Sequence, residues 1–524
     1  MDYKELTAQL KTIQSVKVEE RYPEETYILA GPDDFRQACE LVHKKIHVPV
    51  AMFFAQDKRA AGRGFGLYCV FMSTHQLKKW LIISTDIGPV DPRFDSLART
   101  IYSASLFERE IKEMFGIEPA GNPDLRGLRL HEETWPKGFF PLRKDFKSPD
   151  QRIKPEGEYR FTRGEGEGLF EVPVGPVHAG IIGPGHFRFS VAGEPIINLE
   201  IRLGFTHRGV EKIFEGKTVD QAVGLAEAVC GDTAFGHSLA FCRAIEKISG
   251  LVVPDRGQYI RAIFLELERM YNHVSDIGGI ALDVGFGAPA NLAAMIKESL
   301  QRLNKELSAS RFLKGINTCA GVSRNLDGEK INILKNDLGN ISADFKLLSG
   351  MLFASASFMD RVDGTGVLRK NTAFDLGING LAARACGISL DLRKDFGGVY
   401  PGVKAKVSRD YGGDVLSRLK VRIFEFTEST GLIQGYIDNL PRGDISNDKI
   451  QYKPGFGLGY AEAWRGPVLY WVCLDEQARI ERCKIVDPSF QNWQGLAYGV
   501  LGDIVPDFPV CNKSFDLSYS GTDL

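Results

Sequence analysis

Short apolar runs and one-sided apolar patterns alternate along the first 146 residues. Four runs rich in β-branched or aromatic residues, each bounded by turn residues, predict strands. Apolar residues at helical spacing predict a helix over Asp34–Lys45 and another over Ser103–Phe115, with Gly116 as a C-cap. The pattern indicates an α+β domain over residues 1–146, in which helices accompany an antiparallel sheet. The expected strands are Tyr27–Ala30, Val50–Phe54, Leu67–Met72 and Leu81–Thr85.

A polar segment follows over residues 147–172. It contains SPDQRIKPEGEYRF and RGEGEG, in which glycine and proline interrupt charged residues. Such punctuation is typical of a connector and not of a packed element. We therefore expect a linker between two domains.

Longer amphipathic patterns dominate residues 173–524. The clearest covers Asp255–Ile277, where apolar residues recur at helical spacing after Pro254, a residue that suits a helix start. Strand-like stretches and glycine turns occur near the beginning of this region and over residues 450–495, and we find no internal repeat. The second domain is therefore expected to be mainly α-helical, with peripheral β segments. Further helices are expected over Thr218–Ser249, Glu329–Met359 and Val415–Asn439.

Length and charge restrict the function. A chain of 524 residues is too long for one ordinary core. Its 65 basic and 67 acidic residues give a net charge of −2, which argues against a protein that binds nucleic acid through phosphate contacts. No uncharged apolar run reaches the ~18 residues of a membrane span, and the N-terminal segment lacks the apolar centre of a signal peptide. We expect a cytosolic chain, which still leaves room for a peripheral subunit of a membrane complex.

The cysteines are scattered. There are nine of them, an odd number, and no CxxC motif occurs. A disulfide framework is therefore not expected. Zinc ribbons and ordinary iron–sulfur motifs both need clustered thiolates, so the spacing also predicts no metal site of either kind.

One predicted helix carries three chemically useful side chains. Cys230, Thr233 and His237 fall on one helical face, and Gly231 and Gly236 remove bulk beside them. A small polar cavity would explain this pattern. A buried cysteine in a close helix contact is the other explanation, which this pattern taken alone favours, and both interpretations stay open.

Two histidines and one arginine are further candidates. His178 and His186 lie in the loop GPVHAGIIGPGHFRF, where a histidine is either satisfied by backbone groups or functional. Arg465, beside Gly466, either projects into a cavity or forms a surface salt bridge. The glycine-rich Gly455–Tyr460 lacks the strand-to-helix context of a phosphate loop, so we do not expect a nucleotide site there.

These motifs, taken in order, resemble two related families. Ser105–Phe146 closely resembles the 30 kDa-type subunit of respiratory complex I and the equivalent domain of formate hydrogenlyase-type hydrogenases. The later motifs look like the 49 kDa-type complex I subunit and the large subunit of energy-converting [NiFe]-hydrogenases. The resemblance covers nearly the whole chain and implies a hydrogenase-large-subunit-like fold for residues 173–524. The later motifs are GPVHAGIIGPGHFRF, Phe205–Lys212, the Cys230 helix, Ala383–Asp395, the Arg465 segment and Asp487–Trp493.

The chain departs from the hydrogenase pattern at the metal ligands. That family binds nickel and iron through two CxxC pairs. The resemblance places these pairs at Cys230 and Thr233 and at Ser518 and Gly521, so three of four thiolates are absent. Hydroxyl groups are poor ligands for such soft metal centres. An acidic residue of the family motif is also replaced, by Gly183. The resemblance thus implies a hydrogenase-related subunit that has lost its nickel ligands and holds no metal.

The resemblance further implies a subunit of a respiratory oxidoreductase complex, related to NADH dehydrogenases. Electrons would arrive from a [4Fe-4S] cluster in a small-subunit partner and pass to a quinone or another acceptor, with His178 and His186 as acceptor contacts. Membrane-embedded partners, including antiporter-like subunits, would translocate ions, and any NAD site would belong to a partner. We expect a peripheral place at the cytoplasmic face of the plasma membrane. The cavity would be lined by His186, Cys230, Thr233, His237, Arg465, Asp516 and Ser518.

Some alternatives remain open. Arg384 and Arg393 match a motif that lies near the cluster-bearing partner, which implies an interface, although a buried salt bridge would explain them equally well. The whole chain could instead be a non-catalytic scaffold of such a complex. A hydrogenase with unusual ligands is the third possibility.

Overall fold

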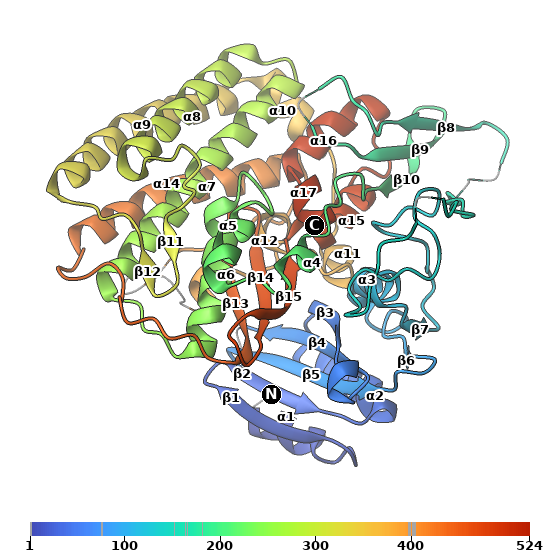
Figure 1. Cartoon of the computed structure of the whole chain (residues 1–524). Coiled ribbons are helices and arrows are strands. Elements are labelled where there is room, and N and C mark those ends of the chain that lie inside the picture. Colours follow the sequence, from blue (N-terminus) through green and yellow to red (C-terminus); the bar gives the residue numbers. More distant parts are fainter. Residues whose placement is uncertain are drawn as a thin grey trace.

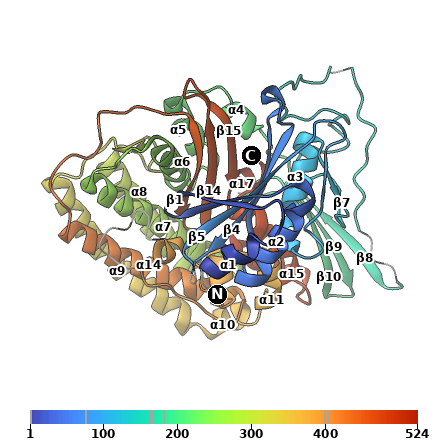
Figure 2. The same cartoon turned by 90° about the horizontal axis from the view of Figure 1, so that it is seen from below.

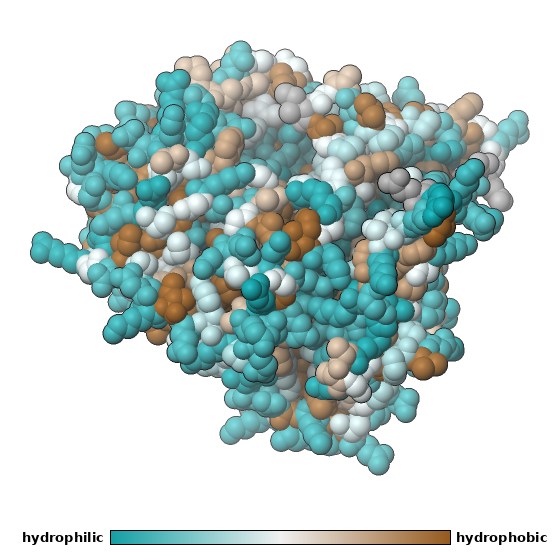
Figure 3. Space-filling view, in the orientation of Figure 1, coloured by the Kyte–Doolittle hydropathy of each residue, from teal (hydrophilic) through white to brown (hydrophobic). Residues whose placement is uncertain are grey.

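The computed structural model describes residues 3–74, 77–150, 152–162, 164, 166–180, 182–396, 400 and 405–524. The described residues form an N-terminal five-stranded sheet, a long helical body, two three-stranded sheets and two two-stranded sheets (Figure 1). Among the described residues, no helix is both long enough and apolar enough to cross a membrane. The face of the molecule in Figure 3 is mostly hydrophilic, with apolar side chains in separate small groups.

The N-terminal sheet has five strands in the order β1-β2-β5-β4-β3. All four predicted strands are confirmed, and the pairing is antiparallel except between β2 and β5, which run parallel. The edge strand β1 was not predicted, because its sequence KVEERY is polar and largely exposed and has no apolar run that would indicate a strand. The strands are β1 (Lys17–Tyr22), β2 (Glu25–Leu29), β3 (Val50–Asp57), β4 (Phe65–Ser73) and β5 (Lys79–Ile87).

Helices accompany this sheet as expected. α2 (Pro32–Ile46) packs on β4 and β5, and α3 (Ser105–Phe115) packs on β3. Gly116 ends α3 in the left-handed conformation with its N–H bonded to the Lys112 carbonyl, which confirms the predicted C-cap. The remaining elements of this part are α1 (Tyr3–Leu10), β6 (Arg93–Asp95) and β7 (Glu118–Ala120).

The first domain shares an apolar core with the end of the chain. β13 (Gly455–Glu462), β14 (Pro467–Leu474) and β15 (Ile480–Val486) form an antiparallel sheet that lies against the N-terminal one (Figure 2). Trp471 of β14 has its ring centroid 4.9 Å from that of Phe54 and 5.0 Å from that of Tyr68. The packing holds the two parts of the chain together even though more than 380 positions separate these partners in sequence.

The predicted linker contains no helix or strand in residues 147–150, 152–162, 164 and 166–168, while Gln151, Arg163 and Glu165 lie outside the described residues. Its last four predicted residues, 169–172, are instead part of a strand, because β8 (Leu169–Val174) pairs with β9 (His186–Ala192). β9 also pairs with β10 (Ile196–Arg202), which gives an antiparallel sheet in the order β10-β9-β8. The division of the chain at residues 146 and 173 stays a prediction, because both parts contribute to one core.

The expected helix over Thr218–Ser249 is wrong. The chain forms α5 (Val219–Glu227) and α6 (Ala234–Ser249), and Cys230 and Thr233 lie in the turn between them. The side chain of Glu268 accepts hydrogen bonds from the N–H groups of Phe235 (2.7 Å) and Gly236 (3.0 Å) and so caps the start of α6. Because this cap comes from a distant helix, local periodicity could not reveal the break.

Long helices form the body of the second domain. α7 (Asp255–Asp283) confirms the predicted helix and packs against α8 (Gly287–Ser308) and α14 (Val415–Asp438), and α9 (Gly328–Ala354) lies beyond α8 (Figure 1). The pattern over Glu329–Met359 is interrupted at Ser355, whose hydroxyl caps α10 (Ala356–Val362). The remaining elements are α4 (Val210–Phe214), β11 (Asn317–Thr318), β12 (Gly321–Val322), α11 (Lys370–Asp375), α12 (Gly380–Ala385), α13 (Leu392–Asp395), α15 (Ser489–Gly499), α16 (Phe508–Phe515) and α17 (Tyr519–Asp523).

One glycine permits the close packing of β13 on α6. A Cβ atom at Gly459 would lie 2.1 Å from the Ala240 carbonyl oxygen and 2.4 Å from the Ala244 nitrogen. We expect Gly459→Ala to lower the free energy of unfolding by about 1–3 kcal/mol. The added methyl group would clash with backbone atoms of α6, and these can move aside only if the helix or the strand shifts. Urea denaturation followed by tryptophan fluorescence measures this. Gly431→Ala, on α14 with open space around the new Cβ, is the control and should instead stabilise by up to about 1 kcal/mol. Equal effects at the two positions would contradict the packing argument.

Candidate functional site

Three segments that lie far apart in sequence meet around one thiol. The turn before α6 supplies Cys230, and the segment before α17 supplies Ser518, whose Oγ lies 3.0 Å from the Cys230 Sγ. The thiol also donates to Asp232 Oδ1 at 3.0 Å, and Arg465 Nη1 lies 3.6 Å from the sulfur. We call this group the Cys230 cluster. Its members are Cys230, Asp232, Thr233, Arg465, Asp516 and Ser518.

Arg465 is the centre of the Cys230 cluster. Its guanidinium group binds Asp232 through two parallel contacts of 2.7 and 2.8 Å, and Nη1 also lies 3.2 Å from the Thr233 hydroxyl. On the other side, Nη2 lies 3.4 Å from Asp516 Oδ2. The group stacks 3.8 Å from the ring centroid of Trp464. A planar fork with these partners is geometry that lysine cannot reproduce.

The charges of the cluster keep the cysteine protonated. Burial and the Asp232 carboxylate raise the pKa of the Cys230 thiol, and Arg465 opposes them only in part. Burial would also raise the pKa of Asp232, but Arg465 outweighs it and lowers that pKa to about 2. Cys230 is therefore a neutral thiol beside an ionised carboxylate. Since the Asp232 side chain is 40% exposed, the cluster reaches the surface at this residue.

His237 lies beside the cluster in a hydrogen-bonded chain of its own. Its Nδ1 is 2.9 Å from the Tyr470 hydroxyl and its Nε2 is 3.1 Å from Asp487 Oδ2. Burial opposes ionisation of Asp487, but its hydrogen bond to His237 and the charge of Arg465 lower its pKa. The expected common helical face of Cys230, Thr233 and His237 does not exist, because only His237 lies in α6. The turn between α5 and α6 brings the cysteine and the threonine together instead, with the Thr233 N–H bonded to the Cys230 carbonyl at 3.1 Å.

The structure does not bring the loop histidines into the cluster. His178 Nε2 lies 2.8 Å from the Gly185 carbonyl, and His186 Nδ1 lies 3.1 Å from the Gly175 carbonyl. Among the described residues, neither has a contact with the Cys230 cluster, and the buried His186 Nε2 has no partner. The loop does approach α17, since a Cβ at Gly183 would meet the ring of Tyr519. The cavity that included His186 is thus not assembled in this structure.

The two arginines expected at an interface are buried inside the chain. Arg384 contacts Glu425 and Glu462, each at 2.8 Å, and Arg393 contacts Asp391 at 2.7 Å. The side chains of both arginines are 0% exposed. The structure therefore corrects the expectation of an interface position in favour of a buried ion-pair network. Carboxylates from α7, α14, β13 and the residue before α13 provide the counter-charges.

Sequence reasoning missed Asp232, the strongest partner of Arg465. The sequence does place an acidic residue, Asp232, between Cys230 and Thr233. That position could have indicated an ion pair with a buried arginine. Sequence reasoning also missed the role of Asp487 as a partner of His237, although Asp487 begins one of the family motifs, and it missed Tyr470, which lies inside β14.

The residues present do not fit a nickel–iron pair. Of the four positions that the resemblance matches to metal-ligand cysteines, Cys230, Ser518 and Gly521 converge, since Ser518 Oγ contacts Cys230 and also accepts the N–H of Gly521 at 2.9 Å. However, this donor set holds one thiol, two hydroxyls and a glycine, and a Cβ at Gly521 would lie 2.6 Å from Asp487 Oδ2. Within the described part of the chain, no group of three histidine, cysteine or acidic side chains is placed to hold a metal ion. A bridged pair of soft metals needs several thiolates and this site offers one sulfur, so we derive no chemistry through such a centre.

The family of this chain follows from comparisons with known proteins. Family profiles match in chain order: respiratory-chain NADH dehydrogenase, 30 Kd subunit, over residues 28–152, nickel-dependent hydrogenase over 208–276, and respiratory-chain NADH dehydrogenase, 49 Kd subunit, over 283–456. Formate hydrogenlyase subunit 5 of Escherichia coli is 32% identical over 93% of this chain and 87% of its own length. Hydrogenase-4 component G of the same organism is 31% identical over 90% of this chain and 83% of its own length.

A solved structure shares the fold. A chain of the archaeal membrane-bound sulfane sulfur reductase superposes with a TM-score of 0.64 at 24% identity, covering 68% of this chain and 99% of that one. This agreement confirms the expected fold, an N-terminal sheet with helices followed by a mainly helical domain with peripheral strands. Together with the identities above, it shows that the chain belongs to the family of fused 30 kDa- and 49 kDa-type subunits of complex I and hydrogenase complexes, which includes formate hydrogenlyase subunit 5 and hydrogenase-4 component G.

Proposed function

We propose that this chain is the large subunit of a membrane-associated, hydrogenase-related respiratory oxidoreductase complex that has lost its nickel ligands and has no nickel–iron centre. The observation that carries the proposal is the Cys230 cluster. The two segments that would supply metal ligands meet there, but Arg465 and Asp232 form a direct ion pair beside a single protonated thiol.

Electrons would reach the cluster from a [4Fe-4S] cluster in a small-subunit partner. They would pass to a quinone or another acceptor, and membrane-embedded partners, including antiporter-like subunits, would couple this step to ion translocation at the cytoplasmic face. The relatives support this assignment by their own names, which include a membrane-bound hydrogenase subunit of Pyrococcus furiosus and an NADH-quinone oxidoreductase subunit of Thermus thermophilus. The partly exposed Asp232 gives an acceptor a place to approach the cluster.

In this proposal Cys230, Thr233, His237, Arg465, Asp516 and Ser518 form the working site. Arg465 pairs with two carboxylates, Asp232 and Asp516, which differ in exposure. Protonation of one carboxylate would weaken its ion pair, and the guanidinium group would then shift toward the other carboxylate. A rearrangement of this kind is a physical means of coupling a redox event to ion movement. His178 and His186 stay predicted acceptor contacts.

Metal content is the first test. We expect the affinity-purified complex to contain no nickel above background by plasma mass spectrometry, and iron only in the amount that the partner clusters require. Hydrogen uptake with a viologen dye should be absent, because one thiol cannot hold the metal pair. Formate hydrogenlyase purified by the same procedure is the positive control. Stoichiometric nickel would overturn the proposal and favour the hydrogenase with unusual ligands.

A redox assay separates the proposal from the non-catalytic scaffold. Arg465→Lys keeps the charge but loses the two parallel contacts to Asp232, so we expect the assembled complex to lose most of its acceptor reduction. Arg302→Lys, on the exposed face of α8, is the matched control. An Arg465→Lys complex with normal subunit content and normal turnover would show that the cluster does no chemistry.

A further inference from the structure

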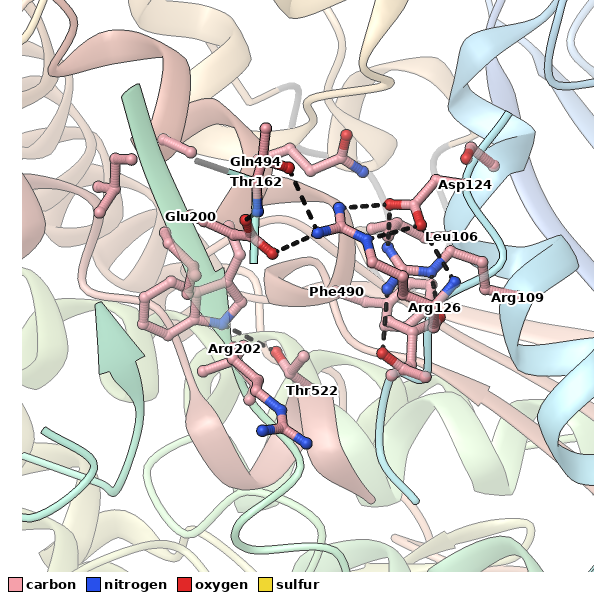
Figure 4. Close-up of a pocket in the computed structure, with 18 of the residues that line it drawn as sticks. Leu106, Arg109, Asp124, Arg126, Thr162, Glu200, Arg202, Phe490, Gln494 and Thr522 are labelled. Carbon is pink, nitrogen blue, oxygen red and sulfur yellow. Dashed lines mark hydrogen bonds and ion pairs between the residues drawn. The ribbon is translucent and has the colours of Figure 1, made fainter. Parts of the chain in front are cut away.

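A second site lies at the seam between the two parts of the chain. A cavity of about 300 Å³ is enclosed by α3, the loop Asp124–Arg129, β10, α15 and α17 (Figure 4). We call it the seam pocket. Of the described residues that line it, none belongs to the Cys230 cluster. Its volume falls at the lower end of the range of small-molecule sites.

The charged groups of the seam pocket already have partners within the chain. Asp523 is 0% exposed and its carboxylate accepts three hydrogen bonds from Gly204 and Thr206, and the other charged groups form ion pairs. Arg126 stands between Asp124, at 2.8 Å, and Glu200, at 2.5 Å, as Figure 4 shows. Arg109 contacts Asp124 at 3.3 Å, and Arg202 contacts Glu133, outside the pocket, at 2.5 Å. An anionic or a cationic ligand would have to break one of these partly buried pairs. The pocket is therefore unsuited to a phosphate, a carboxylate or an amine.

Its open hydrogen-bonding groups are neutral. The side chains of Ser105, Asn198 and Gln494 line the pocket, and none of these described residues has a side-chain hydrogen-bond partner within the described part of the chain. Ser105 is only 4% exposed. Amides and a hydroxyl offer both donors and acceptors to a ligand.

The rest of the lining is apolar and aromatic. Leu106 comes from α3, Tyr102 from the segment just before it, and Ala497, Tyr498 and Leu501 from α15 or the turn that follows it. Tyr102 is 41% exposed and Tyr498 is 46% exposed. Exposed aromatic rings bind ring systems by stacking and by burial of apolar area. The pocket thus combines aromatic surface, neutral polar groups and charged groups that already have partners.

We propose that the seam pocket is a binding site for an uncharged, planar ring compound that carries amide or carbonyl groups at its edge. The ring lies along the α15 side of the pocket, and its polar edge meets Gln494, Asn198 and Ser105. The charged pairs of Arg126 and Arg109 remain intact and exclude ionic compounds of the same size.

Trp493 connects the seam pocket to the Cys230 cluster. Trp493 lines the pocket, and its Nε1 donates to the Thr522 hydroxyl at 3.1 Å and to the Ser518 carbonyl at 3.4 Å. Ser518 is itself in contact with Cys230. The ligand would therefore bind two side chains away from the cluster, although the binding proposal does not depend on the function of the cluster.

Three probes of one size test the proposal. We expect the purified complex to bind 2-naphthamide at least roughly tenfold more tightly than 2-naphthoate or 2-naphthylmethylammonium, measured by calorimetry at one ionic strength. Ala497→Trp, which fills the pocket without removing a hydrogen bond, should abolish 2-naphthamide binding. Gln494→Leu should weaken it roughly three- to tenfold, as loss of one neutral hydrogen bond predicts.

The controls make the result specific to this pocket. Ala343→Trp introduces the same side chain on the exposed face of α9 and should leave binding unchanged. Circular dichroism checks that each variant is folded. Equal or tighter binding of a charged probe, no binding of 2-naphthamide to the wild-type complex, or binding that survives Ala497→Trp would each overturn the proposal. None of these measurements requires redox turnover, so their failure is distinct from a failure of the proposed function.

Discussion

Arg384→Met is expected to lower the free energy of unfolding by about 3–5 kcal/mol, because it removes the cation that lies closest to the buried carboxylates of Glu425 and Glu462. Arg384 is fully buried and contacts Glu425 and Glu462 at 2.8 Å and Asp391 at 3.5 Å. Burial alone would raise the pKa of Glu425, yet Arg384 and its neighbours hold that pKa well below its ordinary value of 4.5. The arginine therefore keeps an ionised carboxylate in the interior.

The pH dependence distinguishes this mechanism from a simple loss of packing. A carboxylate with a lowered pKa stabilises the fold above the unfolded-state pKa of about 4.5 and loses that contribution as the pH falls. Without Arg384 the pKa of Glu425 rises, so the difference between wild type and variant should be full at neutral pH and shrink below about pH 4.5.

Urea denaturation at a series of pH values measures this difference. Arg302→Met removes an arginine whose side chain is 77% exposed and which pairs with Glu298 along α8, and it should cost no more than about 0.5 kcal/mol. A small effect of Arg384→Met at neutral pH, or an effect that does not change with pH, would show that the buried network is dispensable.

The fold was predictable from sequence where its determinants are local. The apolar spacing of Asp255–Ile277 predicts α7 because a helix buries residues at intervals that the sequence itself displays. The break before α6 was not predictable, because the carboxylate of Glu268 caps that helix from a separate element. The parallel pairing of β2 with β5 and the packing of Trp471 on Phe54 are likewise set by contacts between distant segments.

In the candidate site, too, motif residues could be predicted from sequence, whereas contacts between distant segments could not. Cys230, Thr233 and Ser518 could be named because motif positions point to them, and the structure brings all three together. The ion pair of Arg465 with Asp232 joins residues 233 positions apart, and no sequence pattern carries that information. For His186 and Arg384 the motifs suggested contacts that the structure does not show. His186 bonds to the Gly175 carbonyl and Arg384 to Glu462, because a motif match locates a residue in sequence but does not fix which groups it contacts.

Asp232→Asn is expected to make the Cys230 thiol at least roughly tenfold more reactive toward iodoacetamide at pH 8. The reason is electrostatic. The Asp232 carboxylate is the largest cause after burial of the raised pKa of Cys230, and it also engages Arg465, the cation that lowers this pKa. Asparagine keeps the shape and the hydrogen-bonding groups but removes the charge. Each unit by which the thiol pKa falls multiplies the reactive thiolate fraction tenfold.

Site-resolved mass spectrometry of alkylated peptides measures the rate at Cys230 and, in the same sample, at Cys386. Burial also raises the pKa of Cys386, to about 11, and its rate should not change because its contacts lie elsewhere. Combining Asp232→Asn with Arg465→Met should return Cys230 to slow reaction, since the activating cation is then absent. If Asp232→Asn has no effect, or if the double variant reacts as fast as the single one, the Arg465 charge does not control the thiol, and the cluster is held by packing alone.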